Sequence, residues 1–364
     1  MKRLIPLLFP LLAFASMSAA SPDSPLIPAA SPLVRIEGRS APGPDGRVRL
    51  GFPGVTLHLR YRGAALALQL EAGSAKVYFD VYVDRLPPVT LHARPGVGTY
   101  PLLADGTADG EHTIAILRRS ESWQGTCEIA GFAPGTGGTL LPPPPAKERR
   151  LMFIGDSVTS GEYCDYRADD PLGDGRADSH NANAAHSYGA ILAQRLGAEF
   201  HLVSYGGRGL IRDWQGIRAT RNAPQFYELA LPDDPAAPWN PSRYVPDAIG
   251  VGLGTNDFSQ GVPDQNEFVN AYVEFLRKLR RDAPRAWIFL LESPILDDPA
   301  GGVPKHAVHA AYLREIVEKL GDPRITAVPV RHYPGVPDNG HPLAAENAEV
   351  AASLDPLFRH ALGW

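Results

Sequence analysis

Cysteine is scarce in this chain of 364 residues, which contains only Cys127 and Cys164. Two cysteines exclude a disulfide-built scaffold, because such scaffolds need several bridges in a short chain. A single bridge in an oxidising compartment and a pair of buried free thiols are both open alternatives. The fold must therefore come from hydrophobic cores, and a hydrophobic share of 44% in a chain of this length can supply two of them.

Basic residues do not predominate, since 35 Lys and Arg residues stand against 40 Asp and Glu residues, for a formal net charge of −5. No cluster of basic residues could follow a phosphate backbone, so we expect no nucleic-acid partner. Long apolar runs are also missing, because the run 4–15 is too short and too rich in proline to span a bilayer. Lys2 and Arg3 precede this run and small residues follow it up to Ala20. This pattern predicts a signal peptide over residues 1–20, with an uncleaved anchor as the alternative.

The predicted signal peptide implies an exported protein, periplasmic or extracellular, with no membrane association after cleavage. The sequence leaves its oligomeric state open.

Several familiar motifs are absent. The glycines at 250, 252 and 254 lack the G-x-G-x-x-G spacing of a dinucleotide site, and no serine lies in a G-x-S-x-G motif typical of the α/β-hydrolase fold. The aspartate-rich segment 165–180 lacks the spacing of a calcium-binding EF-hand, so we interpret it as a solvated loop. We therefore expect neither a cofactor nor a metal ion.

The first half of the chain has a β pattern. Residues 21–32 are rich in Ser, Pro and Ala, which predicts a disordered leader. Over residues 33–139, short alternating or apolar runs are separated by Gly, Pro and Asp, which is typical of an antiparallel β-sandwich of jelly-roll type. The segment "LLPPPPAKERR", residues 140–150, then predicts a stiff proline-rich linker.

Residues 151–364 alternate between strand and helix patterns, which favours an α/β domain. Strands are expected at Leu151–Ile154, Phe200–Ser204, Ala248–Leu253, Trp287–Leu291 and Ile325–Val330. Helices are expected at Ser187–Leu196, Gln265–Arg281, Lys305–Leu320 and Ala344–His360. Such alternation predicts a parallel sheet covered by helices on both faces, with ligands bound at the carboxyl ends of the strands.

A serine follows the first of these strands, in "FIGDSVTSGEY". A serine hydroxyl attacks a substrate only when a base takes its proton and donors stabilise the resulting oxyanion. Three candidate partners of Ser157 also follow predicted strands: Gly207 in "SYGGRG", Asn256 in "GLGTNDFS" and His341 in "DNGHPL". Each alone has an ordinary explanation in turn geometry or helix entry. Together they predict a site at one edge of the sheet.

The four blocks "FIGDSVTSG", "SYGGRG", "LGTND" and "DNGHP" resemble the signature blocks of the SGNH, or GDSL-type, esterases and lipases, whose α/β/α fold is flavodoxin-like. The preceding β-sandwich, "SYGGRGLIRDW" and "LGTNDFS" are similar to carbohydrate esterase family 2, two-domain enzymes that remove O-acetyl groups from plant polysaccharides such as xylan. The resemblance implies that Ser157 is the nucleophile and His341 the general base. It implies an oxyanion hole made by the backbone N–H groups of Ser157 and Gly207 and the side-chain amide of Asn256.

The third catalytic residue is predicted to be Asp338, three residues before His341, as in the wider esterase family. A Ser–His dyad, in which a backbone carbonyl orients the histidine, is the alternative, because some relatives resemble dyads and "PDNG" is itself a strong turn signal.

We expect substrate contacts from residues in loops near the site, where aromatic faces could stack on sugar rings and loop packing is the alternative. These residues are Tyr163, Arg208, Trp214 and Trp239.

The predicted function is a serine esterase that deacetylates a polysaccharide through an acetyl-enzyme. One alternative is an esterase or lipase acting on lipid, aryl or peptidoglycan O-acetyl esters, since loops that the pattern does not predict decide the substrate. A non-catalytic carbohydrate-binding protein is the other alternative. For the polysaccharide esterase and for the binding protein alike, the expected partner is an acetylated polysaccharide or oligosaccharide.

Overall fold

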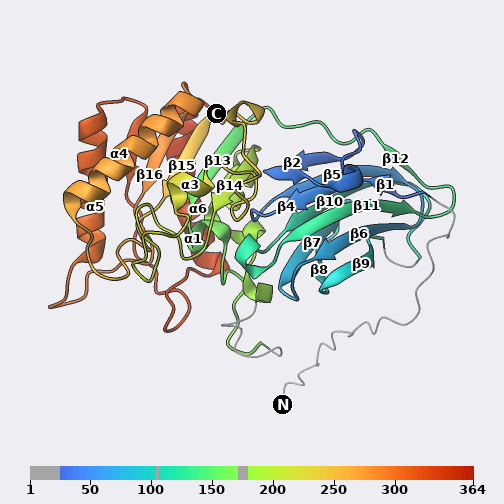
Figure 1. Cartoon of the computed structure of the whole chain (residues 1–364), viewed down its shortest axis with the longest axis horizontal. Coiled ribbons are helices and arrows are strands. Elements are labelled where there is room, and N and C mark those ends of the chain that lie inside the picture. The colour runs from blue at the N-terminus through green and yellow to red at the C-terminus, as the bar shows by residue number, and fades with distance from the viewer. Residues whose placement is uncertain (1–24, 104–105, 171–178) are drawn as a thin grey trace, which may run out of the picture.

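The computed structural model describes residues 25–103, 106–170 and 179–364. Figure 1 shows two parts side by side, a β-sandwich and an α/β domain with helices outside its sheet. The predicted signal peptide 1–20 and leader residues 21–24 lie outside the described residues. Within the described part of the chain, no helix has both the length and the apolar character needed to cross a bilayer.

The β-sandwich consists, in the described residues, of two six-stranded antiparallel sheets. One contains β3 (Ser40–Pro42), β4 (Val48–Leu50), β11 (Cys127–Pro134), β6 (Leu66–Ala72) and β9 (Gly96–Pro101) in that order, with β1 (Ile27–Pro28) also on β11. The other contains β12 (Thr139–Leu141), β5 (Thr56–Arg62), β10 (Glu111–Arg118), β7 (Val77–Val83) and β8 (Val89–Ala93), with β2 (Arg35–Glu37) on β5. Leu66, Leu68 and Leu70 show the two-residue period, because they are buried while the residues between them are more exposed.

The structure differs from the predicted leader and linker. Ile27 and Pro28 pair with Phe132 and Gly131, and Ala29 is fully buried, so residues 25–32 are part of the sandwich. Residues 139–141 pair with β5, which brings the beginning of the predicted linker into the second sheet. Proline is tolerated in such short pairings at a sheet margin, as Pro28 shows. Composition alone therefore did not reveal them.

The second domain has the predicted parallel sheet, five-stranded in the described residues, in the order β14–β13–β15–β16–β17. The strands are β13 (Arg150–Gly155), β14 (Glu199–Ser204), β15 (Ala248–Gly252), β16 (Trp287–Leu291) and β17 (Ile325–Val328). The helices are α1 (Ser157–Ser160), α2 (Tyr188–Arg195), α3 (Ala223–Phe226), α4 (Gln265–Asp282), α5 (Lys305–Leu320) and α6 (Ala344–Leu362). This 2-1-3-4-5 order is that of flavodoxin-like folds, which confirms the predicted fold class.

Helices cover both faces of this sheet. Phe153 in the interior strand β13 packs on Tyr188 of α2 and on Phe358 of α6, with ring centroids 5.7 and 6.2 Å apart. Its neighbours Met152 and Ile154 belong instead to the core that includes residues of α4 and α5. This alternation follows from the two-residue period of a strand. It leaves the carboxyl ends of the strands as the edge where polar groups can gather.

The two domains pack into one continuous core. Arg39 of the sandwich is only 1% exposed, and its guanidinium donates to the backbone oxygens of Tyr227 and Leu229 in the second domain, at 2.5 and 2.9 Å. It also lies 4.9 Å from the ring centroid of Tyr227 and 5.0 Å from that of Trp239. A buried cation held by carbonyl groups and aromatic faces fixes the two domains together.

Candidate active site

Ser157 is the first residue of α1, directly after β13. The preceding Asp156 caps this helix, since its side chain accepts a hydrogen bond from the N–H of Val158 at 3.1 Å. Gly155 is required before it, because a Cβ there would lie 2.0 Å from Oγ1 of Thr159. The abrupt change from strand to helix thus holds the serine at the carboxyl edge of the sheet.

His341 comes to the same place from a segment 184 residues further along the chain. Its Nε2 lies 2.7 Å from Oγ of Ser157, which is hydrogen-bonding distance. The half-buried imidazole also faces Tyr163, with ring centroids 5.2 Å apart. The sequence-based prediction that Ser157 and His341 meet therefore agrees with the geometry, and the distance is one at which an imidazole could take a hydroxyl proton.

The partner of the other ring nitrogen differs from both predicted arrangements. Nδ1 of His341 is hydrogen-bonded to Oδ1 of Asn339, where Asp338 or a backbone carbonyl was expected. Asp338 has a φ of +60°, and the N–H groups of Asn339 and Gly340 both donate to the backbone oxygen of Val336. This tight turn puts the side chain of residue 339 against the imidazole. An amide oxygen at Nδ1 accepts its proton and leaves Nε2 free to accept the serine proton.

The imidazole is held in its neutral form. Removal from water lowers the pKa of His341 to about 4. Its Nδ1 partner, Asn339, is a neutral amide and brings no negative charge that would favour the imidazolium. The histidine therefore remains a proton acceptor well below neutral pH.

This arrangement predicts where activity is lost in acid. We expect the acid limb of kcat/KM to fall near pH 4 rather than near 6.5, because the base works only when unprotonated. Asn339→Asp puts a negatively charged carboxylate beside Nδ1 of His341. This charge raises the pKa of His341 and moves the acid limb of kcat/KM to higher pH. A pH–rate profile on a small acetyl ester measures both positions. Asn240→Asp, at an exposed turn-capping asparagine, is the control, and an unmoved limb in Asn339→Asp would contradict the assignment.

Asn256 and the turn at Gly207 lie beside the segment that carries Ser157. Gly207 has a φ of +75°, in the left-handed region, and its backbone oxygen accepts from the N–H of Trp214 at 2.9 Å. The side-chain Nδ2 of Asn256 donates to Oδ2 of Asp156 at 3.2 Å and to the backbone oxygen of Arg208 at 3.0 Å. The amide thus lies between the residue before Ser157 and the residue after Gly207, and the structure brings the three predicted blocks together.

Asp257 is a residue of this region that the sequence analysis missed. It is fully buried, and its carboxylate accepts hydrogen bonds from the backbone N–H groups of Leu210, Ile211 and Arg212. The side chain of Arg212 in turn donates to the backbone oxygen of Asp257 at 2.7 Å. The loop after Gly207 is therefore built around the residue that follows Asn256. The adjacency of "ND" in "GTNDFS" was the available signal.

The predicted substrate contacts fall into two groups. Trp214 is 55% exposed. Its ring lies against the turn at Gly207, where an added Cβ would be 2.9 Å from Cδ1 of the tryptophan. Arg208 is half-buried, over the ring of Tyr205 and 3.4 Å from Asp213. Trp239 is only 6% exposed and packs on His201 and Arg39, so its prediction as a sugar contact is wrong. An apolar loop residue became core because the other domain covers it.

Trp123 is an exposed tryptophan that the sequence analysis did not select. It belongs to the short helix η2 (Ser122–Gln124) of the sandwich and is 45% exposed. Its Nε1 lies 3.1 Å from the position that a Cβ on Gly206 would take. Tryptophans of the two domains therefore flank the consecutive glycines 206 and 207.

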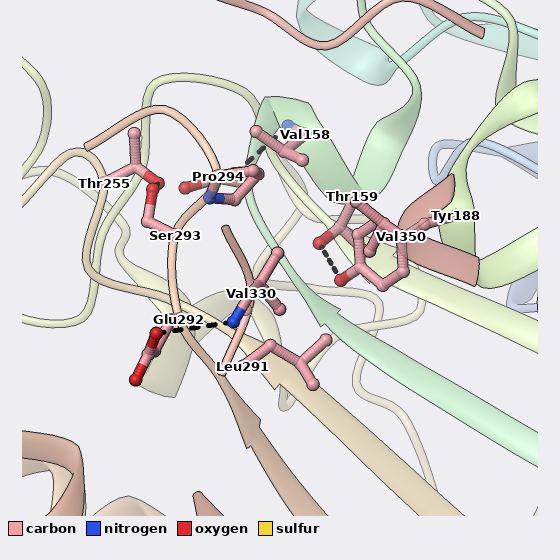
Figure 2. Close-up of a pocket in the computed structure, with 12 residues that line it drawn as sticks. Val158, Thr159, Tyr188, Thr255, Leu291, Glu292, Ser293, Pro294, Val330 and Val350 are labelled. Atoms are coloured by element: carbon pink, nitrogen blue, oxygen red, sulfur yellow. Dashed lines mark hydrogen bonds between the residues drawn. The ribbon is translucent and has the colours of Figure 1, made fainter. Parts of the chain in front are cut away.

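A small cavity lies behind the nucleophile, among side chains at the carboxyl ends of the strands (Figure 2). Its volume of about 20 Å³ is enough for one water molecule and too small for a sugar. Thr159 and Tyr188 share a hydrogen bond of 2.8 Å at one side, and Glu292 accepts from the N–H of Val330 at 3.3 Å at another (Figure 2). The helix that carries Ser157 is thus supported by close packing.

Cys127 and Cys164 are both free and buried. Burial raises the pKa of the Cys127 thiol to about 12 and that of Cys164 well above its ordinary value. Of the two alternatives left open by the sequence, the structure has the pair of buried thiols.

Comparison with known proteins agrees with this geometry. Residues 153–353 match the GDSL-like Lipase/Acylhydrolase family, and residues 36–144 match the family described as Carbohydrate esterase 2 N-terminal. The serine and histidine that meet at the sheet edge lie within the first of these matches. The protein is therefore a carboxylic ester hydrolase of the GDSL-like class.

The relatives narrow the class. The chain is 34% identical to an acetylxylan esterase / glucomannan deacetylase of Cellvibrio japonicus, over 93% of this chain and 91% of that one. It is similar to the structure of a family two carbohydrate esterase from the same organism, with a TM-score of 0.86, 32% identity and coverage of 94% and 99%. It is also similar to the structure of a family two carbohydrate esterase from Clostridium thermocellum in complex with cellohexaose. The TM-score is 0.82 and the identity 27%, over 91% of this chain and 99% of that chain. The chain belongs to carbohydrate esterase family 2.

Proposed function

We propose that this protein is an exported serine esterase that removes O-acetyl groups from a plant cell-wall polysaccharide such as acetylated xylan. The observation that carries the proposal is the 2.7 Å contact between Oγ of Ser157 and Nε2 of His341 at the carboxyl edge of the sheet. The acetylxylan esterase / glucomannan deacetylase of Cellvibrio japonicus supports the acetylated polysaccharide as substrate. The export signal proposed for residues 1–20 rests on the sequence pattern alone.

In the proposed first step, Nε2 of His341 takes the proton of Ser157 while Oγ attacks the acetyl carbonyl carbon. The carbonyl oxygen becomes an oxyanion, and the imidazolium then returns the proton to the sugar oxygen as the C–O bond breaks. A water molecule, deprotonated by the same imidazole, attacks the acetyl-enzyme and releases acetate. Asn339 holds the ring through both steps, because its amide oxygen fixes the proton on Nδ1.

The oxyanion hole in this proposal is made by the backbone N–H groups of Ser157 and Gly207 and by Nδ2 of Asn256. Support comes from the position of Asn256, whose amide bridges Asp156 and the backbone oxygen of Arg208. An amide held in place before the substrate binds costs little reorganisation when the oxyanion forms.

The sugar chain in this proposal lies over the surface around Gly206 and Gly207, where Trp214 and Trp123 are exposed. The apolar face of a pyranose suits a tryptophan ring, while Arg208 and Tyr163 lie close enough to the turn and the imidazole to meet polar groups of the substrate. Trp239 is excluded from this role by its burial.

A panel of acetyl esters tests the proposed substrate. Acetylated xylan, acetylated glucomannan, O-acetylated peptidoglycan and aryl esters of increasing acyl length are assayed side by side, on the parent and on Ser157→Ala. We expect the highest kcat/KM on an acetylated polysaccharide. A preference for long-chain esters or peptidoglycan would replace this substrate, and binding of polysaccharide without turnover would favour the non-catalytic alternative.

Tryptophan variants test the sugar surface. Trp214→Ala and Trp123→Ala are each expected to raise KM for the acetylated polysaccharide about threefold to tenfold, as expected for the loss of one stacking contact. Trp214→Phe and Trp123→Phe should recover most of this loss, and KM for a small aryl acetate should change little. The control is Trp364→Ala, at a tryptophan that packs on Arg149. Equal losses on the polymer and on the aryl acetate would contradict the stacking role.

A further inference from the structure

A loop of the β-sandwich reaches into the catalytic domain at the turn that carries the proposed oxyanion donor. Oε2 of Glu121 accepts a hydrogen bond of 2.5 Å from the backbone N–H of Gly206, the residue directly before Gly207. Glu121 is 2% exposed, so this contact is shielded from water. Glu121 and Gly206 are 85 residues apart in the chain and belong to different domains.

The loop that presents Glu121 is held rigidly. Arg118 is fully buried, and its guanidinium donates to four backbone oxygens, those of Leu50, Ser120, Glu121 and Gly125. Five N–H donors on a planar group allow one arginine to hold a whole loop in this way. The carboxylate of Glu121 therefore starts from a fixed backbone.

A second contact joins the same two segments. Asp233 accepts a hydrogen bond from the hydroxyl of Ser122 at 2.5 Å and another from the hydroxyl of Tyr205 at 2.9 Å. Ser122 follows Glu121, and Tyr205 precedes Gly206, so residues 121–122 and 205–206 are tied together at adjacent positions. The sandwich thus sets the entry to the turn.

The turn itself needs such support. Gly206 and Gly207 are consecutive glycines, which lose more conformational freedom on folding than any other residue and are not held by side chains of their own. On the far side, the backbone oxygen of Gly207 accepts from Trp214. The peptide plane that carries the N–H of Gly207 lies between the Gly206 N–H, held by Glu121, and the Gly207 backbone oxygen, held by Trp214. An oxyanion donor is effective only when it is oriented before the charge develops.

A further carboxyl group closes the space around the turn. A Cβ on Gly206 would lie 3.0 Å from Oε1 of Glu121 and 3.1 Å from Oε2 of Glu162. Burial raises the pKa of Glu121 to about 7, and burial together with the charge of Glu121 raises that of Glu162 to about 8. Two carboxyl groups placed so closely share protons rather than both being ionised near neutral pH.

From these contacts we propose that Glu121, supplied by the β-sandwich, is a positioning residue for ester hydrolysis, because it fixes the Gly206–Gly207 turn that presents the Gly207 N–H to the oxyanion. The inference rests on the proposed function. It also gives the N-terminal domain a part in the chemical step, in addition to any contact with the sugar chain.

Kinetics of Glu121 variants test this role. Glu121→Ala removes the acceptor of the Gly206 N–H, and we expect kcat to fall about tenfold to a hundredfold on an aryl acetate and on acetylated polysaccharide alike, with KM nearly unchanged. Glu121→Gln keeps a side-chain oxygen that can accept this hydrogen bond, so it should recover most of kcat. The control is Glu199→Gln, which weakens another contact between the domains, the 2.5 Å hydrogen bond from Arg35.

Two results would overturn the proposal. One is a kcat of Glu121→Ala equal to that of the parent. The other is a fall in kcat, in Glu121→Ala and Glu199→Gln alike, that is fully explained by a smaller fraction of folded protein. Amide hydrogen exchange of a peptide covering residues 205–208 supplies a readout that needs no turnover. We expect faster exchange there in Glu121→Ala and not in Glu199→Gln. If the parent hydrolyses no ester while this exchange difference is present, the proposed function fails but the positioning of the turn by Glu121 stands. If residues 205–208 exchange equally fast in both variants, the positioning itself is overturned.

Discussion

Ser157→Ala is expected to abolish hydrolysis of every acetyl ester, with a loss of about a millionfold in kcat where the assay can follow it. The expected loss is this large because Oγ of Ser157 forms the covalent bond to the acetyl group in the proposed mechanism. In the described residues, no other hydroxyl is shown in hydrogen-bonding contact with the imidazole of His341. The fold should be unchanged, because the helix cap is made by Asp156 and the cavity behind is lined by Val158 and Thr159.

The measurement combines turnover with labelling. Parent and Ser157→Ala are assayed on an aryl acetate, and a serine-reactive phosphonate is followed by mass spectrometry of the intact protein. The parent should take up one label on the peptide that contains Ser157, and the variant should take up none. Ser160→Ala is the matched control, because the hydroxyl of this nearby serine on the same helix is hydrogen-bonded with the backbone oxygen of Asp156 and the hydroxyl of Ser204 instead of His341. Near-parental turnover in Ser157→Ala would refute the mechanism.

His341→Ala is expected to be nearly as damaging, with a loss in kcat of at least about a thousandfold. Without the imidazole, the hydroxyl of Ser157 has no base at its 2.7 Å contact, and the leaving sugar oxygen has no acid. KM should change little if the histidine acts on the proton alone. The double variant with Ser157→Ala should lose no more than Ser157→Ala itself, because the two residues act as one unit.

His341→Gln separates this role from packing. Glutamine preserves a polar side chain beside Tyr163 and Asn339 but cannot accept and return a proton at neutral pH. It should therefore be as inactive as the alanine variant while keeping the thermal stability of the parent more closely. Recovery of turnover in His341→Gln would show that the residue only shapes the site.

The order of elements and the meeting of Ser157 with His341 were largely predictable. Hydrophobic runs of the right length, followed by glycine or polar residues, located the five strands of the parallel sheet, and the structure has them at nearly those positions. The edge at which Ser157 and His341 meet followed from the rule that parallel strands end on the same side. These features depend on local periodicity, which a single sequence contains.

The differences from the predictions concern surroundings that local periodicity does not contain. Asp338 was predicted beside the histidine, with a Ser–His dyad as the alternative, and the turn between Val336 and Gly340 brings Asn339 to Nδ1. Trp239 was predicted as a sugar contact, with loop packing as the alternative, and the structure has it packed against Arg39 and His201. In both cases the residue type was informative and its environment was not, because one rotation of a turn or one packed neighbour decides which atoms meet.

The roles of Glu121 and Trp123 could not be inferred from their surroundings in the chain. Both lie in a short helical turn that joins two strands of the sandwich, and neither belongs to a recognisable catalytic block. Only the packing of the sandwich against the second domain brings this turn beside Gly206. The boundary predicted for the linker treated the two domains as separate, whereas their cores are continuous.

The sequence by itself determined the class of fold and the order of the four blocks, and it indicated that Ser157 and His341 meet at one edge of the sheet, because local periodicity locates the strands and parallel strands end on the same side. The tertiary structure alone decided which side chain holds the imidazole, which tryptophans face solvent and which domain supports the Gly206–Gly207 turn. The first outcome depends on the rotation of the turn at residues 336–340, and the other two depend on contacts between segments far apart in sequence, which form only when the whole chain has packed.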